Sequence, residues 1–297
     1  MSHARLKELA GAVQRHARSE GSCDTRIPRL SLYRSSKPTV SDAVVYLPSL
    51  CVVVQGAKEV IVEGEAYHYD PAHSLLVSVD LPATSRVVEA SAAKPCLVAV
   101  IQIDSADVGD LLANGAAATL RSAPSRGIGV TPVEPALLDA ITRLVQLLDR
   151  PNDIVALSPL VLREITYRLL NGPQGARLRQ IAAPGTPAQR IAHIIRWLRE
   201  HFAEPIRIDR LADQMGLSQS ALHQHFKALT GLSPLQYQKR LRLQEARRMM
   251  FSDGLEAAEA AYSVGYESPS QFGREYRRLF GAPPRQDVAA LAAATSA

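Results

Sequence analysis

Hydrophobic and polar residues alternate differently in three parts of the chain. From about residue 43 to residue 104, short runs rich in β-branched residues, among them LCVVVQG, KEVIVEGE and CLVAVIQID, are separated by glycine and proline. Several short strands without helices between them predict an antiparallel sandwich or a small barrel. Ahead of these strands, MSHARLKELAGAVQRHARSE carries charges throughout and predicts a short amphipathic helix.

Two helices are predicted after the strands. In EPALLDAITRLVQLLDR the apolar positions recur at spacings of four, three and four residues, which is one helix stripe: Leu137, Ile141, Leu144 and Leu148. Pro151 ends this helix. The segment SPLVLREITYRLLNG predicts a second helix, with Ser158 as N-cap, Pro159 as the first helical residue and Gly172 at its end. We expect this pair either to cover the β domain or to contact a second subunit.

The next segment, residues 171–190, is rich in proline and glycine, lacks periodicity and predicts a linker. Beyond it the pattern is helical to about residue 285, and the tail VAALAAATSA is expected to fray. The sequence therefore predicts an α+β protein of two domains. Residues 1–175 form an antiparallel sandwich or small β-barrel with two flanking helices, and residues 187–286 form an all-α domain.

The helical part contains an internal repeat. LADQMGLSQSALHQHFKALTG, residues 211–231, returns about fifty residues later as AEAAYSVGYESPSQFGREYRRLFG. Gly216 matches Gly265 before the turn in each copy, and Ser218 matches Ser268 after it. Glycine allows a left-handed bend, and serine caps the helix that follows. Each copy therefore predicts a helix-turn-helix unit.

The second helix of each unit carries residues that suit base recognition. In the first unit Leu222, Phe226 and Leu229 form a core stripe, so the polar side chains face outward. An α-helix fits the major groove of DNA, where glutamine bonds adenine and arginine bonds guanine. We predict base contacts from the following residues: Gln219, Ser220, His223, Gln224, Ser270, Gln271 and Arg274.

Other polar residues suit phosphate contacts, which position a protein on DNA without reading its sequence. The helix predicted between the two units is rich in arginine, and about 18 residues of helix span roughly 27 Å. Recognition helices held that far apart fit successive major grooves, which lie about 34 Å apart. We predict phosphate contacts from the following residues: Ser218, Lys227, Lys239, Arg247, Arg248, Ser268, Arg277 and Arg278.

The distribution of charge favours the same interpretation. The chain has 297 residues and a net charge of +5. Residues 187–285 hold 15 Lys and Arg against 10 Asp and Glu, whereas the rest of the chain holds 19 of each. A basic segment beside a neutral one is typical of a module that binds a polyanion. No apolar run reaches the roughly 18 residues of a membrane span, and the three scattered cysteines suggest a reducing compartment, so we expect a cytoplasmic protein.

The helical part also resembles a known family. LADQMGLSQSALHQHFKALTGLSP and AAYSVGYESPSQFGREYRRLFGAPP are similar to the DNA-binding domain of the AraC/XylS family of bacterial transcription regulators. The resemblance implies seven helices, with two helix-turn-helix units joined by a long helix. The chain departs from the usual family pattern at Gln224, where arginine is common, and at Ala221, where an aromatic residue is usual.

The strand region resembles a family domain as well. SLCVVVQGAKEVIVEGEAYHYDP and LLVSVDLPATSRVVEAS are similar to the cupin-like N-terminal domain of one AraC-type subfamily. This resemblance implies that the domain binds a small effector or forms a dimer. The expected protein is therefore a regulator or activator of transcription that binds double-stranded DNA, responds to a small-molecule effector, forms a homodimer and contacts RNA polymerase.

The N-terminal domain offers a few candidate sensor residues. Thiolates attack electrophiles, and polar-tipped rings line small-ligand pockets, so we select the following: Cys51, Cys96, Tyr67 and His68. If the strands that begin near the two cysteines are adjacent, the thiols lie near each other or near an internal pocket.

Other chemistry is predicted to be absent. Cupin metal centres use a His-x-His pair, but His68 and His73 lie five residues apart, so we predict no metal. The chain has no Gly-x-Ser-x-Gly, phosphate loop or dinucleotide glycine pattern, so we predict no cofactor and no enzyme activity. A cupin-type metalloenzyme tethered to a DNA-binding domain, and a non-specific architectural DNA protein, stay as alternatives.

Overall fold

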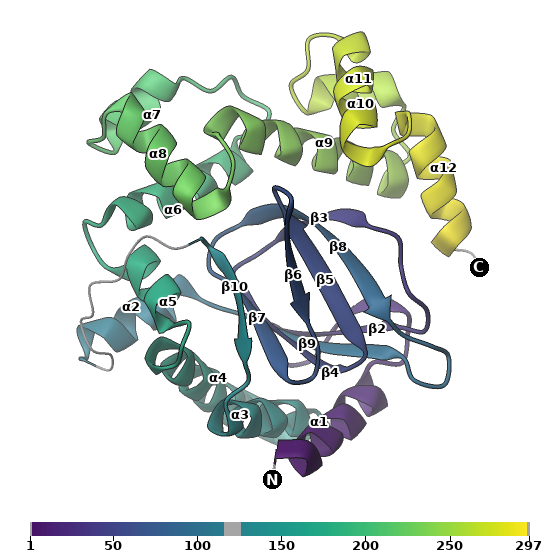
Figure 1. Ribbon diagram of the computed structural model, residues 1–297, viewed down its shortest axis with the longest axis vertical. Coiled ribbons are helices and arrows are strands. Elements are labelled where there is room, and N and C mark those ends of the chain that lie inside the picture. The colour runs from purple at the N-terminus through teal and green to yellow at the C-terminus, as the bar shows by residue number, and fades with distance from the viewer. Residues whose placement is uncertain (1, 116–125, 296–297) are drawn as a thin grey trace.

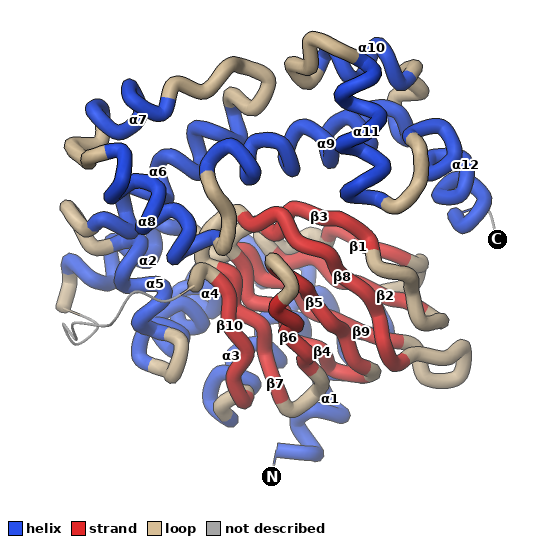
Figure 2. Tube along the Cα trace, turned by 45° about the horizontal axis from the view of Figure 1, so that its top comes forward, coloured by secondary structure: helices blue, strands red, loops and turns tan. Residues whose placement is uncertain are grey.

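The computed structural model describes residues 2–115 and 126–295. Its β-rich N-terminal part contains two antiparallel sheets (Figures 1 and 2). The six-stranded sheet has the order β1-β2-β9-β4-β7-β10 and the four-stranded sheet the order β3-β8-β5-β6. The strand bounds are β1 Gly21–Asp24, β2 Leu30–Ser35, β3 Asp42–Tyr46, β4 Ser49–Gln55, β5 Ala57–Val62, β6 Glu65–Tyr69, β7 His73–Val77, β8 Leu81–Glu89, β9 Cys96–Gln102 and β10 Ile128–Pro132.

The sheets face each other and stay open. The predicted barrel is therefore wrong in its closure, although the predicted α+β class, with a β-rich N-terminal part and a helical C-terminal part, is confirmed. The chain passes from one sheet to the other at Gly56, which has a φ of +79°. A Cβ at this position would overlap the carbonyl oxygen of Glu89, so only glycine fits the crossing.

Helices cover the outer face of the six-stranded sheet. They are α1 Ser2–His16, α3 Pro135–Gln146 and α4 Ile154–Asn171, and two short 3₁₀ turns, Leu147–Asp149 and Pro151–Asp153, join α3 to α4. Helix α2 Ser105–Ala113 packs against α4. Residues on one face of this sheet, such as Leu50, Val52 and Leu97, pack with the apolar stripe of α3. The predicted N-terminal helix and the helix after the strands are confirmed, and their stripe covers the sheet rather than facing solvent.

Three details of the helical prediction are wrong. The second helix begins at Ile154, four residues before Ser158, and Pro159 lies inside it. Proline is tolerated there because the lost hydrogen bond belongs to the carbonyl of Val155, an exposed residue in the first turn. The predicted linker contains a helix, α5 Gly175–Ala182, which buries Leu178. The tail continues as α12 Pro284–Thr295 because its alanines are strong helix formers.

The C-terminal part contains α6 Pro187–Glu200, α7 Ile208–Gln214, α8 Gln219–Thr230, α9 Pro234–Ser252, α10 Ala257–Ser263, α11 Pro269–Phe280 and α12. Within the described residues these are the seven helices that the family resemblance implies. Figure 1 shows α9 across one side of the sheets, with α7 and α8 near one end and α10 and α11 near the other. One apolar cluster runs from between the sheets into α6, α8 and α9, and a second lies between α9, α10 and α11.

Candidate nucleic-acid interface

The two predicted helix-turn-helix units are built in the same way. In the first unit α7 ends before Gly216, with a φ of +60°, and the hydroxyl of Ser218 accepts a hydrogen bond from the backbone N–H of Ala221 at 3.2 Å. In the second unit α10 ends before Gly265, with a φ of +86°, and the hydroxyl of Ser268 accepts from the N–H of Gln271 at 3.4 Å. Both turns therefore use left-handed glycine followed by a serine N-cap.

The recognition helices end alike as well. Gly231 after α8 and Gly281 after α11 have φ values of +82° and +83°, and each N–H bonds a carbonyl of the preceding turn. The inner faces are apolar: Leu222 and Phe226 in α8, and Phe272 and Tyr276 in α11, are fully or almost fully buried. These contacts fix the rotation of each helix about its own axis, and that rotation decides which side chains face outward.

The side chains predicted to read bases are exposed in both units. In α8 this group comprises Gln219, Ser220, His223 and Gln224, and in α11 it comprises Ser270, Gln271 and Arg274. Gln271 donates a hydrogen bond from its side-chain NH₂ to Glu275 at 3.2 Å, so one N–H of that amide is already engaged. The structure brings each set together on one helix face, at opposite ends of α9.

The residues predicted to contact phosphates divide into three groups. Lys227, Arg277 and Arg278 are exposed on the recognition helices. The hydroxyls of Ser218 and Ser268 cap their helices. The three predicted residues of α9 are held by carboxylates instead, and that set is Lys239, Arg247 and Arg248.

Arg247 is the clearest case of a basic side chain turned inward. Its guanidinium is 13% exposed, lies 2.7 Å from a carboxylate oxygen of Asp287 in α12 and also contacts Asp42 in β3. Burial lowers the pKa of Arg247, but the hydrogen bonds that its guanidinium donates to the two carboxylates, together with their charges, outweigh burial and leave the pKa raised. In this arrangement Arg247 joins α9 to the four-stranded sheet and to α12, and it is not presented to a phosphate.

The sheets and α9 are joined by further polar contacts. The hydroxyl of Tyr237 donates to the backbone carbonyl of Asp80 at 2.9 Å in a fully buried position. The amide of Gln244 donates to the carbonyl of Val44 at 3.0 Å, and Arg240 contacts Glu63 in the β5–β6 hairpin. The helix that connects the two units is therefore also the surface on which the sheet domain rests.

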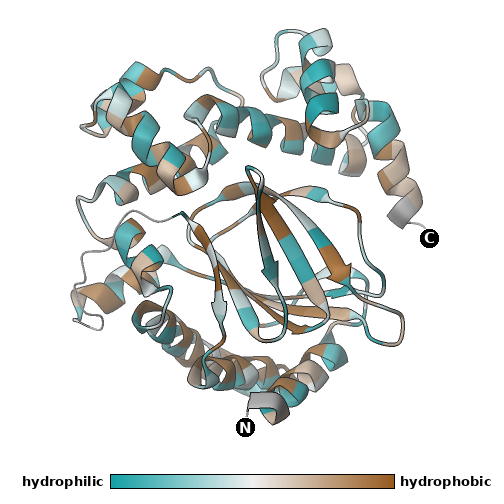
Figure 3. Cartoon of the chain, viewed as in Figure 1, coloured by the Kyte–Doolittle hydropathy of each residue, from teal (hydrophilic) through white to brown (hydrophobic). Residues whose placement is uncertain are grey.

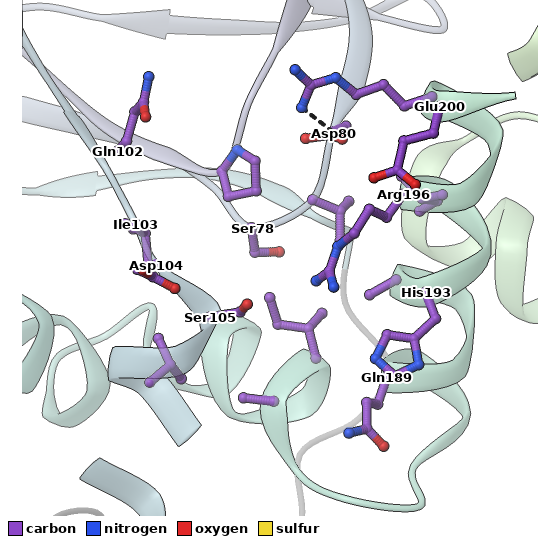
Figure 4. Close-up of a pocket in the computed structure, with 18 of the residues that line it drawn as sticks. Ser78, Asp80, Gln102, Ile103, Asp104, Ser105, Gln189, His193, Arg196 and Glu200 are labelled. Atoms are coloured by element: carbon purple, nitrogen blue, oxygen red, sulfur yellow. Dashed lines mark hydrogen bonds and ion pairs between the residues drawn. The ribbon is translucent and has the colours of Figure 1, made fainter. Parts of the chain in front are cut away.

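A cleft of about 510 Å³ lies where the sheet domain meets α6. Figure 4 shows Arg196 and His193 extending from α6 into it, opposite Ser78 and Ser105. Arg199 lies 3.4 Å from Asp80 at one side of this cleft. Burial raises the pKa of Asp80, and the nearby arginines only partly offset it. The lining combines arginines, carboxylates and hydroxyls with apolar residues of both parts, which suits a small ligand that has polar and apolar ends.

The N-terminal candidates are more scattered than the sequence implied. Cys51 and Cys96 lie on adjacent strands β4 and β9, but Cys51 pairs with Val100, four residues along β9 from Cys96. Four residues of strand span about 13 Å, so the thiols are not neighbours. Tyr67 is partly buried and His68 is exposed, and both lie on the edge strand β6.

Sequence reasoning missed Lys58, which points between the sheets. The sequence did contain a signal for this direction. Alternate residues of a strand point to the same face, and Lys58 alternates with Val60 and Val62, which are both buried. In the described part of the chain, no group of three His, Cys, Asp or Glu residues is arranged to hold a metal ion. None of the helices described is long and apolar enough to span a bilayer.

Comparison with known families gives two matches. A model described as the N-terminus of AraC-type transcriptional regulators matches residues 26–177. A model described as a helix-turn-helix domain matches residues 211–289, which include both units.

Individual relatives agree with these matches. The chain is 38% identical over 97 residues to the HTH-type transcriptional activator RhaS of Escherichia fergusonii, covering 33% of this chain and 35% of that protein. It is 32% identical over 154 residues to RhaS of Salmonella schwarzengrund, covering 52% and 55%. The chain thus spans from about a third to about half the length of these curated relatives.

Solved structures of low sequence identity share the fold. ToxT from Vibrio cholerae O395 has a TM-score of 0.54 at 13% identity and covers 87% of this chain and 96% of that one. Wild-type ToxT from strain SCE256, solved with an unsaturated fatty acid bound, also has a TM-score of 0.54, at 10% identity, and covers 87% and 94%.

Proposed function

Since the chain belongs to the AraC-type family of transcriptional regulators, we propose that it is a cytoplasmic, sequence-specific DNA-binding regulator and not an enzyme. Residues 187–286 bind DNA in this proposal, and residues 1–175 modulate that binding through an effector and a dimer contact. As the relatives named RhaS are activators, we assign this chain the same role, which requires contact with RNA polymerase.

One observation carries the DNA-binding proposal. Two units with the same turn, the same serine cap and the same left-handed C-cap stand at opposite ends of α9, a helix of 19 residues. At 1.5 Å per residue this helix is roughly 28 Å long. That length suits two recognition helices in successive major grooves of one face of the duplex.

The direct test is to map the bound sites of the full-length protein across the genome in wild-type and deletion strains, and then to measure affinity for a recovered site and for random DNA. We expect the recovered site to bind at least about 10³-fold more tightly than random DNA at physiological salt. A ratio near one would support the architectural alternative and overturn the proposal.

The cleft beside α6 supports modulation by a small molecule. It is lined by both the sheet domain and α6, so a ligand there would contact the DNA-binding part and the sensor part at once. Such a ligand shifts DNA binding only to the extent that it prefers one arrangement of the two parts. Arg196 and His193 favour a ligand with an anionic group, and R196Q should weaken its binding while leaving DNA affinity in its absence unchanged.

An exposed apolar stripe on α4 supports the dimer. Leu157, Leu160 and Tyr167 are 43%, 64% and 46% exposed and follow one another at helical spacing. Figure 3 shows hydrophobic residues along α3 and α4, on the side of the molecule away from α9. Large apolar side chains gathered on one exposed helix face are typical of a protein contact. A second copy of the chain, packed with α4 against α4, would cover this stripe.

A further inference from the structure

Lys58 on β5 points into the space between the two sheets. It pairs with Tyr69 on β6 and with Val87 on β8, and both of these side chains are buried. Directly paired residues of antiparallel strands lie on the same face of a sheet. The ammonium of Lys58 accordingly reaches the opposite sheet, where it lies 4.2 Å from the centre of the Tyr33 ring on β2.

This ammonium has an aromatic ring, and no acid, as its neighbour. Among the residues that the structure describes, Lys58 forms neither an ion pair with a carboxylate nor a hydrogen bond. A buried charge without a counter-ion is costly, and a lysine relieves that cost by releasing its proton. Burial lowers the pKa of Lys58, and the nearby thiols of Cys51 and Cys96 only partly oppose this effect.

The same interior makes the two cysteines poor nucleophiles. Burial raises the pKa of Cys51, and it raises that of Cys96 to about 11, with Lys58 opposing both shifts. The thiolate is the reactive form of cysteine, so both side chains stay protonated and weakly reactive at neutral pH. A neutral amine needs no such ionisation. Among the nucleophiles gathered between the sheets, only the amine of Lys58 has its pKa moved toward the reactive, neutral form, while burial moves both thiols away from theirs.

We propose that Lys58 is a covalent capture site for small apolar aldehydes. The lone pair of the neutral Lys58 nitrogen attacks the carbonyl carbon to form a C–N bond, the nitrogen gives up both of its protons to the carbonyl oxygen, and that oxygen leaves as water as the C=N bond of the imine forms. No oxidant or reductant is needed. The imine is less basic than the amine, so the product leaves no unpaired charge between the sheets, and apolar neighbours such as Val87 favour an aldehyde without a charge of its own.

Part of the Lys58 residue is exposed, although its ammonium lies between the sheets, so an aldehyde has to be small to reach the nitrogen. Imine formation at Lys58 does not depend on DNA binding. A sensor role for Lys58 rests on the proposed function, because only a regulator would convert the imine into a change in transcription. The test therefore measures capture alone, so that its failure and a failure of DNA binding are distinguishable.

The full-length protein is treated with propanal and sodium cyanoborohydride at pH 7, and the six lysines of the sequence are followed by peptide mass. Reduction traps each imine as a propyl group. We expect Lys58 to be labelled several-fold faster than Lys94, whose side chain is 65% exposed, because burial lowers the pKa of Lys58 and so raises the fraction of its amine that is neutral at pH 7. Near pH 11 the order should reverse, since Lys94 is then neutral as well and more accessible.

Two variants keep the test informative. Lys58→Met removes the amine while leaving an apolar side chain of similar length, so it should stay folded and lose the fast label. Lys94→Met should keep the fast label at Lys58. Labelling of Lys58 no faster than Lys94 at pH 7, or adducts on Cys51 or Cys96 in place of Lys58, would overturn the inference.

Discussion

The ammonium of Lys239 in α9 lies 2.8 Å from a carboxylate oxygen of Glu275 in the second recognition helix. The other oxygen of Glu275 accepts a hydrogen bond from the hydroxyl of Tyr266 at 2.8 Å. These contacts hold α11 against α9 and against the turn that precedes α11. An acid on the recognition helix thus serves the orientation of that helix, while Arg274 and Arg277 beside it are exposed.

Glu275 should make stability depend on pH in a defined direction. Burial raises its pKa, but hydrogen bonds from Lys239, Gln271 and Tyr266 outweigh burial and leave the pKa below its usual value. A carboxyl with a lowered pKa stabilises the fold above its ordinary pKa of about 4.3, and that contribution is lost as the pH falls through the folded value. In urea titrations E275Q should be less stable than the wild type at pH 7, and the gap should narrow below about pH 4.3. E267Q, at an exposed position in the same unit, should show no such gap.

Arg274 should read a base, whereas Arg278 should contact phosphate. We expect R274A to lose about 1–3 kcal/mol on the specific site and to relax preference at one guanine, with random DNA little affected. R278A should weaken both kinds of DNA and reduce the salt slope by about one. R248A is the matched control. Glu245 and Asp253 already hold the guanidinium of Arg248, so this variant should leave the affinity for both kinds of DNA nearly unchanged. Equal losses on specific and random DNA for R274A would argue against base readout.

Gly265 should be irreplaceable, unlike the similar glycine after α11. A Cβ on Gly265 would overlap the carbonyl oxygen of Ala203, whereas one on Gly281 would meet no atom within 4 Å among the described residues. Both have positive φ, which costs a non-glycine residue about 1–2 kcal/mol. We expect G281A to lose about that much and G265A to lose more than about 3 kcal/mol, because backbone strain and overpacking add. Similar losses in chemical denaturation would show that the contact is unimportant.

A charge on α4 should disrupt the proposed dimer. L160E places a carboxylate in the exposed stripe, and we expect the mass from analytical ultracentrifugation to fall to that of one chain at micromolar concentration. Val155 is 86% exposed, and five residues of helix turn it about 140° away from Leu160. V155E should therefore leave the mass unchanged. A wild-type protein that already sediments as a monomer would contradict the α4 interface.

Cys51 and Cys96 should not form a disulfide with each other. A disulfide needs Cα atoms within about 7 Å, and the register places these residues about 13 Å apart along β9. After treatment with diamide, peptide mapping should show both thiols free, while the partly exposed Cys23 is modified. Recovery of a peptide that links Cys51 to Cys96 would mean that the two strands can change register.

The sequence predicted the recognition helices well because all of their determinants are local. Each unit can be recognised within about twenty residues from its glycine, its serine cap and an apolar stripe. Phe226 and Tyr276 are buried, as that stripe predicts. The internal repeat adds a second, independent copy of the same signal. The antiparallel strands were equally visible, because alternation and turn residues are also local properties.

Features that depend on distant partners were not predictable in this way. Arg247 resembles a phosphate contact in sequence, but its acidic partners Asp42 and Asp287 lie 205 and 40 residues away. Whether a barrel closes likewise depends on hydrogen bonding between strands of the two sheets, and the sequence of a single strand does not indicate that pairing. Lys58 is an intermediate case. Its alternation with Val60 is visible in the sequence, but a lysine is normally expected on the outer face of a strand, so its inward direction was not predicted.

The double use of α9 has a consequence for the DNA site that the proposed function requires. The same helix separates the two recognition helices and carries the sheet domain through Tyr237 and Gln244. Its length cannot adjust, so the two half-sites must keep a fixed helical phase. Five added base pairs would turn the second half-site to the far side of the duplex, since one turn takes about 10 base pairs, whereas a full added turn would restore the side but exceed the reach of one chain.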